Sequence, residues 1–236
     1  MADYVFQRSE KKYLVEKQRL NSFLEDIKER IIPDRYGEYK ICNVYFDTED
    51  DFLVRASNEK PPYKEKLRMR SYGVIDEDGR VFLEIKKKYD GIVYKRRVSM
   101  THKEAMDAVR DKKMPQSTGQ IGREIEYFLR RYEVSPKLYL SYERRAFTGL
   151  VENDLRITVD DNILSRYDDV SLVKGDWGEK LLPEGYLLME IKTASAFPMW
   201  LAKALSEYEI TPTSFSKYGN IYRKNITANM EIQNVF

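Results

Sequence analysis

Residues 63–70, Tyr-Lys-Glu-Lys-Leu-Arg-Met-Arg, place a cation at every second position. In a β-strand, successive side chains point to opposite faces, so one face of this segment carries four cations in a row: Lys64, Lys66, Arg68 and Arg70. Like charges on one face repel each other, and this face must therefore contact water or a polyanion. A solvated face would account for one such strand, but the pattern recurs along the chain, and the recurrence favours a polyanion site.

Alternation of charged and apolar residues predicts eight strands in all. They cover residues 4–12, 40–47, 63–70 and 80–88, a segment after Gly91, and residues 137–147, 155–159 and 185–193. Asp90-Gly91 is typical of a tight turn between two strands. The charged faces of the strands carry far more cations than carboxylates, and their residues are Arg8, Glu10, Lys12, Lys66, Arg68, Arg70, Glu84, Lys86, Lys95, Arg97, Arg144, Arg156, Glu190 and Lys192.

Several segments between the strands have the apolar spacing of amphipathic helices. We predict helices over residues 17–32, 123–133 and 213–222, one that starts at the capping box Thr101-His102-Lys103-Glu104, and one that Pro198 opens. His102 falls in the first turn of its helix, where we expect an exposed residue without a catalytic role. Residues 160–185 are predicted to form a long loop, and a loop of that length inside a domain is typically functional or mobile.

The helices decide which way the strands face. If the charged faces pointed outward, the apolar faces would fill a closed core and leave the helices no surface to cover. In the reverse arrangement, the helices pack on the apolar outside of an eight-stranded antiparallel β-barrel and the charges line its tunnel. We therefore predict an α+β fold, a barrel tunnel with a charged lumen and helices outside, formed by residues 1–236 as a single domain.

The overall composition limits the classes of site. The chain has 41 Lys and Arg against 39 Asp and Glu, so a polyanion site depends on local segregation of charge. The single cysteine, Cys42, excludes an internal disulfide, and the single histidine, His102, excludes a His-based zinc site and disfavours a His-dependent triad. The first residues lack the apolar stretch typical of a signal sequence, and no apolar run of about 18 residues occurs. We expect a cytoplasmic protein without direct membrane insertion.

The charged tunnel predicts the class of ligand. Low-dielectric walls would concentrate its positive potential on a compact, highly anionic molecule that can thread it: ATP or another nucleoside triphosphate, triphosphate or polyphosphate. Nucleic acid is disfavoured, because duplex binders present basic convex elements and single-strand binders place aromatics on an open face. The P-loop pattern Gly-x-x-x-x-Gly-Lys does not occur, and the sequence predicts no particular protein partner.

Eight short motifs, in order along the chain, resemble one known family. They are Arg8-x-Glu10-x-Lys12-Tyr13, Tyr45-Phe46-Asp47-Thr48, Lys66-Leu67-Arg68-x-Arg70-x-Tyr72-Gly73, Glu84-Ile85-Lys86, Tyr142-x-Arg144-x-Ala146-Phe147, Leu155-Arg156-Ile157-Thr158, Met189-Glu190-Ile191-Lys192 and Ser216-Lys217-Tyr218. The sequence resembles the catalytic domain of the vacuolar transporter chaperone (VTC) polyphosphate polymerases, which belongs to the triphosphate tunnel metalloenzymes alongside the CYTH group. The resemblance spans nearly the whole chain and implies an eight-stranded antiparallel tunnel that transfers the ATP γ-phosphate onto a polyphosphate chain.

The resemblance also implies roles for individual residues. The residues it assigns to phosphate binding are Lys12, Arg68, Arg70, Lys86, Lys95, Arg144, Arg156 and Lys217; of these we assign catalytic roles to Lys12, Arg68, Arg70, Arg144 and Arg156. Glu190 would hold a divalent Mn²⁺ or Mg²⁺ ion, both of which accept oxygen ligands. The strand pattern adds Glu10 as a second metal ligand, and further phosphate ligands at Arg8, Lys66, Arg97 and Lys192.

One departure from the wider class bears on the reaction. Hydrolytic CYTH proteins typically begin Glu-x-Glu-x-Lys, whereas this chain has Arg8 at the first position, which leaves fewer carboxylates to hold metal and activate water. We therefore favour a polyphosphate polymerase. A metal-dependent tripolyphosphatase or nucleoside triphosphatase, and a non-catalytic polyphosphate-binding module, stay open as alternatives.

Overall fold

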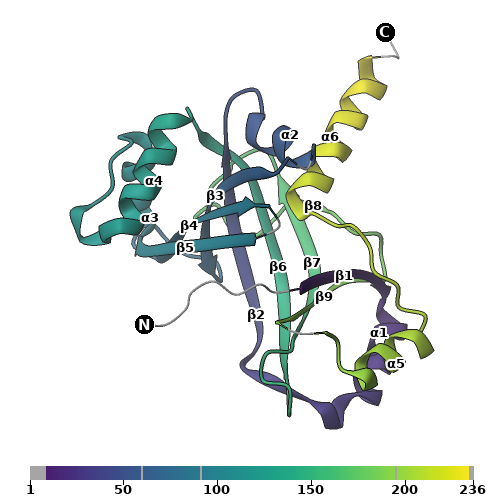
Figure 1. Ribbon diagram of the computed structural model, residues 1–236. Coiled ribbons are helices and arrows are strands. Elements are labelled where there is room, and N and C mark those ends of the chain that lie inside the picture. Colours follow the sequence, from purple (N-terminus) through teal and green to yellow (C-terminus); the bar gives the residue numbers. More distant parts are fainter. Residues whose placement is uncertain (1–8, 60, 91, 195, 234–236) are drawn as a thin grey trace. The chain divides into compact units, whose positions relative to one another are not determined.

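The computed structural model describes residues 9–59, 61–90, 92–194 and 196–233 (Figure 1). Its strands are β1 (Ser9–Glu16), β2 (Ile31–Asp47), β3 (Tyr63–Tyr72), β4 (Arg80–Tyr89), β5 (Ile92–Thr101), β6 (Ser135–Gly149), β7 (Arg156–Arg166), β8 (Glu179–Lys180) and β9 (Tyr186–Thr193). Its helices are α1 (Lys17–Asp26), α2 (Phe52–Asn58), α3 (His102–Arg110), α4 (Gly119–Arg131), α5 (Met199–Glu207) and α6 (Lys217–Gln233). The predicted α+β class is confirmed.

The strands pair in the order β1-β9-β7-β6-β2-β3-β4-β5, and the short β8 pairs with β7. The pairs of β1 with β9, β9 with β7, and β2, β3, β4 and β5 in succession are antiparallel, as predicted. The chain divides into two compact units. The first unit comprises the described residues within 1–40, 142–163 and 180–215, and the second those within 41–141, 164–179 and 216–236.

In the first unit, helices cover the apolar face of β1, β7 and β9. The strands contribute buried side chains such as Tyr13, Ile157 and Met189 to one core, and α1 contributes Leu20 and Phe23. Helix α5 completes this core with Leu201, Ala204 and Leu205. Because the apolar residues alternate with charged ones along each strand, this packing leaves the charged side chains on the opposite face.

The second unit repeats the arrangement with a separate core. Leu67, Leu83 and Val98, from β3, β4 and β5, pack beneath α3 and α4, which lie beside these strands in Figure 1. The helices supply the other side of the core through Ala105, Ala108, Val109, Ile125, Phe128 and Leu129. The prediction that helices cover the apolar strand faces is therefore confirmed in each unit.

The predicted end of the first helix, at residue 32, and the predicted start of the second strand, at residue 40, are both wrong. The helix predicted over residues 17–32 ends at Asp26, and Ile31 begins a 17-residue strand instead of closing the helix. A single 3-10 turn, Lys28–Arg30, separates the two elements, and Pro33 favours extended backbone at Ile32, within the strand. Ile31 is 7% exposed and packs in the same core as α1. The apolar spacing therefore correctly predicted that Ile31 is buried with this helix, although the residue itself is not helical.

The predicted loop over residues 160–185 is also shorter than expected. Strand β7 continues to Arg166, because the alternation of buried residues persists through Ile163 and Ser165. Within the remaining segment, residues 179–180 form β8. Helix α6 begins at Lys217 rather than residue 213 and reaches Gln233. The first half of the predicted strand 4–12 lies outside the described residues.

The surroundings of His102 differ from the prediction. The capping box at the start of α3 is present, with Thr101 and Glu104 bonded reciprocally. His102 is nevertheless only 4% exposed, and its Nδ1 lies 2.8 Å from Oε2 of Glu77 in the turn before β4. The start of the helix packs against that turn, and a helical position alone does not reveal this contact.

Among the helices of the described ranges, none has the length and apolar character needed to cross a membrane.

Candidate functional site

In the second unit, four cations surround one buried carboxylate, a group that we call the Glu84 cluster. Oε2 of Glu84 lies 2.6 Å from Nε of Arg68 and 3.9 Å from Nε of Arg70. Its Oε1 lies 2.9 Å from Nζ of Lys95 and 3.8 Å from an Nη of Arg97. The cluster therefore holds more positive charge than its carboxylate can balance.

The sheet register builds this cluster. Arg68, Glu84 and Arg97 are direct cross-strand neighbours on β3, β4 and β5, and Lys66, Lys86 and Lys95 form the adjacent row. Glu84 is 1% exposed. Burial alone would raise the pKa of Glu84, but the charges of Arg68, Arg70 and Lys95 hold the pKa at about 2. The carboxylate stays ionised and keeps the cations close together.

Two residues of β2 fix the arginines from the other side. Asn43 is fully buried; its Oδ1 accepts the Nε–H of Arg70 at 2.9 Å, and its amide donates to the Leu140 carbonyl at 3.0 Å. The Tyr45 hydroxyl lies 3.3 Å from an Nη of Arg68. The sequence pattern alone predicted no role for Asn43 or Tyr45. The available signal was their shared face on the predicted strand 40–47, since two polar residues facing a cationic strand suggest partners for it.

Three groups in this region titrate close to pH 8. Burial lowers the pKa of Lys66 to about 8 and that of Lys95 to about 8. Burial would raise the pKa of Tyr45, but the neighbouring charge of Arg68 and the further cations lower it to about 8. Each ammonium costs free energy in the folded protein, and a bound polyanion would offset that cost.

We expect triphosphate binding at pH 8 to take up protons. A polyanion next to Lys66, Lys95 and Tyr45 raises the pKa of each group, and near pH 8 the free protein has these groups partly deprotonated. Affinity should accordingly fall between pH 7 and pH 9. Calorimetric titrations in two buffers with different ionisation enthalpies measure the proton uptake.

The control for this uptake is the double variant Lys66→Met Lys95→Met. It lacks both ammonium groups, so it should take up fewer protons while the titration of the triphosphate itself is unchanged. Equal uptake by the variant and the unaltered protein would contradict the assignment. In the unliganded protein these two lysines act in the opposite sense. Their contribution to stability should rise from pH 8 to about pH 10.4, because unfolded lysines still bind protons that the folded lysines have released.

In the first unit, two lysines and two glutamates alternate in a group that we call the Glu190 cluster. Nζ of Lys12 lies 3.4 Å from Glu10 and 4.0 Å from Glu190, and Nζ of Lys192 lies 3.5 Å from Glu10 and 3.2 Å from Glu190. The register of β1 with β9 creates this pattern, because Lys12 opposes Glu190 and Glu10 opposes Lys192. Lys12 also donates to the Phe215 carbonyl at 2.8 Å.

Two arginines of the first unit are paired with aspartates. Arg144 donates to both carboxylate oxygens of Asp160, at 2.6 and 2.7 Å, and its guanidinium carbon lies 5.0 Å from the centre of the Tyr142 ring. Arg156 lies 3.1 Å from Asp34 and opposes Lys192 across the β7–β9 pair. A phosphate ligand would compete with these carboxylates for the guanidinium groups, which suit planar anions.

The oxygen atoms around Glu190 suit one kind of metal site. Thr158 opposes Glu190 across β7 and β9, and its Oγ1 is buried without a hydrogen-bond partner among the residues that the structure describes. Within the same residues, no group of three His, Cys, Asp or Glu side chains forms a candidate metal centre. Mg²⁺ commonly uses one or two carboxylates together with water and substrate phosphates. Glu10 and Glu190 therefore fit an ion that shares its coordination with a phosphate ligand.

The predicted site residues are shared between the units. The first unit holds Glu10, Lys12, Arg144, Arg156, Glu190 and Lys192, and the second holds Lys66, Arg68, Arg70, Lys86, Lys95, Arg97 and Lys217. The structure brings Glu10, Lys12, Glu190 and Lys192 together in one unit, and Arg68, Arg70, Lys95 and Arg97 together in the other. The predicted phosphate ligand Arg8 lies outside the described residues.

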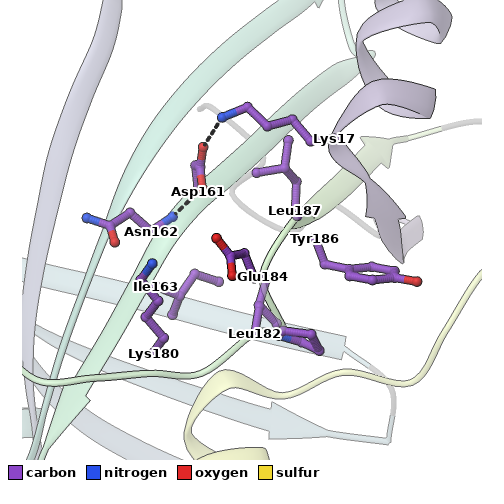
Figure 2. Close-up of a pocket in the computed structure, with 11 residues that line it drawn as sticks. Lys17, Asp161, Asn162, Ile163, Lys180, Leu182, Glu184, Tyr186 and Leu187 are labelled. Atoms are coloured by element: carbon purple, nitrogen blue, oxygen red, sulfur yellow. Dashed lines mark hydrogen bonds and ion pairs between the residues drawn. The ribbon is translucent and has the colours of Figure 1, made fainter.

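A cavity of about 330 Å³ in the first unit does not include any predicted site residue (Figure 2). Its charged lining consists of Lys17 and Lys180 together with Asp161 and Glu184, and Nζ of Lys17 lies 3.5 Å from Asp161. Because cations and carboxylates balance there, this cavity does not favour a polyanion.

Solved structures with the same fold include proteins from a bacillus, a vibrio and a plant. A putative adenylate cyclase from Bacillus halodurans is 16% identical, with 89% of this chain and 95% of that chain covered and a TM-score of 0.53. A putative adenylate cyclase from Vibrio parahaemolyticus is 13% identical, with 92% and 98% covered and a TM-score of 0.51. A putative adenylyl cyclase from Hippeastrum, described as having a dominant triphosphatase activity, is 15% identical, with 92% and 95% covered and a TM-score of 0.54.

These likenesses assign the fold to the CYTH-like tunnel proteins, as the sequence motifs predicted. The chain belongs to the VTC domain family, whose model matches residues 7–225 and so spans both units. A comparison with curated proteins finds no match.

Proposed function

We propose that this chain is a polyphosphate polymerase that transfers the γ-phosphate of ATP onto a polyphosphate chain. The Glu84 cluster is the observation that carries the proposal, since four cations share a single buried carboxylate. A triphosphate or polyphosphate would supply the missing negative charge. The membership in the VTC domain family supports the polymerase reaction, and the single cysteine supports a reducing, cytoplasmic setting.

The chemistry needs no nucleophile from the protein. A terminal oxygen of the acceptor chain attacks the γ-phosphorus, the bond from that phosphorus to the β–γ bridging oxygen breaks, and ADP leaves with the bond's electron pair. Phosphoryl transfer depends on positioning and on neutralising charge at the transferring oxygens. Arg68, Arg70, Arg144 and Arg156 offer paired N–H donors for this purpose, and Lys12 offers a point charge.

A divalent ion fits the proposal at Glu190 and Glu10. When bound, Mn²⁺ or Mg²⁺ would supply charge neutralisation and orientation of phosphate oxygens. Lys12 and Lys192 form ion pairs with these two carboxylates in the unliganded protein. For an ion to bind there, both lysines would turn away from the carboxylates and toward phosphate. The lysines thus neutralise part of the negative charge of the two carboxylates before the ion arrives.

Hydrolysis is the second candidate function. The triphosphatase activity described for the Hippeastrum protein favours it, and hydrolysis requires a group that activates water. In this chain both carboxylates of the Glu190 cluster pair with lysines, which leaves no unpaired carboxylate in that cluster to activate water and favours transfer to phosphate over transfer to water.

Purified protein incubated with ATP and Mn²⁺ should produce a ladder of polyphosphate chains on a denaturing gel. The ladder should be absent with EDTA and in the Glu190→Gln variant, which retains the shape of the side chain but loses its charge. If the products contain orthophosphate but no chains, the protein is a hydrolase and the polymerase proposal is wrong. If ATP or triphosphate binds without being turned over, the protein is a non-catalytic binding module.

A further inference from the structure

The start of helix α6 carries the sequence Ser216-Lys217-Tyr218-Gly219, of which only Lys217 has a predicted role in phosphate binding. Ser216 precedes the helix, accepting the Asn220 N–H at its carbonyl (2.7 Å) and the Gly219 N–H at its hydroxyl (3.3 Å). Lys217 is consequently the first residue of the helix, where the backbone is fixed by the contacts of the next turn.

Tyr218 connects this turn to the strand that carries Tyr45. Its side chain is 4% exposed, and its hydroxyl donates to Oδ2 of Asp47 at 2.9 Å. Asp47 is fully buried and also accepts the backbone N–H groups of Leu53 and Val54 in α2, at 2.8 and 3.0 Å. One carboxylate at the end of β2 therefore holds the first turns of both α2 and α6.

The Tyr218 ring lies between residues of the candidate site. Its centre is 5.0 Å from that of Tyr45, which bonds Arg68, and Nζ of Lys66 lies 5.7 Å from the same ring. Burial, followed by the Asp47 charge, raises the pKa of Tyr218 well above its ordinary value. The phenol therefore stays protonated and continues to donate to Asp47.

Gly219 leaves room for the side chain of Asn58 at the end of α2. A Cβ added at this position would lie 2.6 Å from Oδ1 of Asn58, the last residue of α2. Figure 1 shows α2 beside the first turns of α6. The hydrogen bond, the ring contacts and the close approach of Asn58 all meet within two residues of Lys217.

We propose that Tyr218 is a positioning residue for Lys217. By holding the first turn of α6 against Asp47 and Tyr45, it sets the place from which the Lys217 ammonium reaches phosphate, and it does so through the backbone. This inference rests on the proposed function, in which Lys217 binds phosphate. Its new content is that the affinity gained from Lys217 depends on the Tyr218–Asp47 hydrogen bond.

A double-mutant cycle on triphosphate affinity, measured by calorimetry, tests the dependence. Tyr218→Phe should weaken binding about tenfold, the scale of a hydrogen bond to a charged group, and Lys217→Met should weaken it by a similar factor. The double variant should bind within about twofold of Lys217→Met alone, because Tyr218 then has no lysine to position. The matched control is Tyr222→Phe, one turn later on the same helix, which should leave affinity unchanged.

Gly219→Ala is the second variant, and it retains the Tyr218 hydroxyl while crowding Asn58. It should weaken triphosphate binding in the same Lys217-dependent way. If the factors by which Tyr218→Phe and Lys217→Met each weaken binding simply multiply in the variant that carries both, the inference is wrong, while the proposed function still stands. Failure of the unaltered protein to bind triphosphate would overturn the proposed function, and this inference with it.

Discussion

Replacing Glu84 by Gln should lower the free energy of unfolding by about 3 kcal/mol, the low end of the range for breaking a buried ion pair. Glu84 is 1% exposed and faces four cations. Its loss leaves those cations repelling one another, although partial hydration of Arg68 and Lys95 moderates the cost. Urea unfolding, followed by circular dichroism, measures the change.

Triphosphate should stabilise the Glu84→Gln variant more than the unaltered protein, since the ligand supplies the missing negative charge. The variant should also lose less stability in acid. Glu84 has its pKa held at about 2 against an ordinary 4.5, so its contribution is present above pH 4.5 and disappears as the pH falls toward 2. Glu133→Gln is the control: its partner is Lys112, its side chain is 91% exposed, and it should change little. Equal effects of the two variants would contradict the role of Glu84.

Arg68→Ala should reduce polymer formation on the order of 100-fold, the effect of losing one preorganised donor to a transition-state oxygen. Arg68 is held from both sides, by Glu84 at 2.6 Å and by the Tyr45 hydroxyl at 3.3 Å, so its guanidinium is in place before substrate binds. Initial rates at saturating ATP measure the loss.

The matched control is Arg96→Ala, on β5. Arg96 pairs with Glu124 of α4 at 2.6 Å, on the helix-covered side of the sheet, and its removal should leave the rate nearly unchanged. A variant Arg68→Lys should recover only part of the activity, because an ammonium lacks the paired donors of a guanidinium. Full activity of the Arg68→Ala variant would show that Arg68 has no catalytic role.

Alternation along single strands predicted much of the candidate site. Lys66, Arg68 and Arg70 share a face of β3 because the strand period is two, and Leu67 and Met69 are buried on the other face. Such information lies within one short segment and needs no knowledge of its neighbours. The apolar faces likewise predicted that helices would cover them.

The central role of Glu84 required the cross-strand register. The sequence places Glu84 on a charged face, but only the pairing of β3, β4 and β5 brings Arg68 and Arg97 beside it. Asn43 bonds Arg70 across 27 residues of sequence, a contact set by which strands are neighbours. Ile31 shows the converse error, since its spacing fitted a helix but it begins strand β2.

The most direct test of the polymerase is to follow labelled phosphate from ATP. The reaction is run with Mn²⁺ and ATP that carries ³²P at the γ-phosphate, and the products are passed over a resin that retains nucleotides. The γ-label should appear in polyphosphate chains that pass through the resin. Label at the α-phosphate should instead stay on the resin with ADP. Glu190→Gln should fail to transfer the γ-label, and Arg68→Ala should transfer it on the order of 100-fold more slowly. Recovery of the γ-label only as orthophosphate, or full transfer by both variants, would contradict the account.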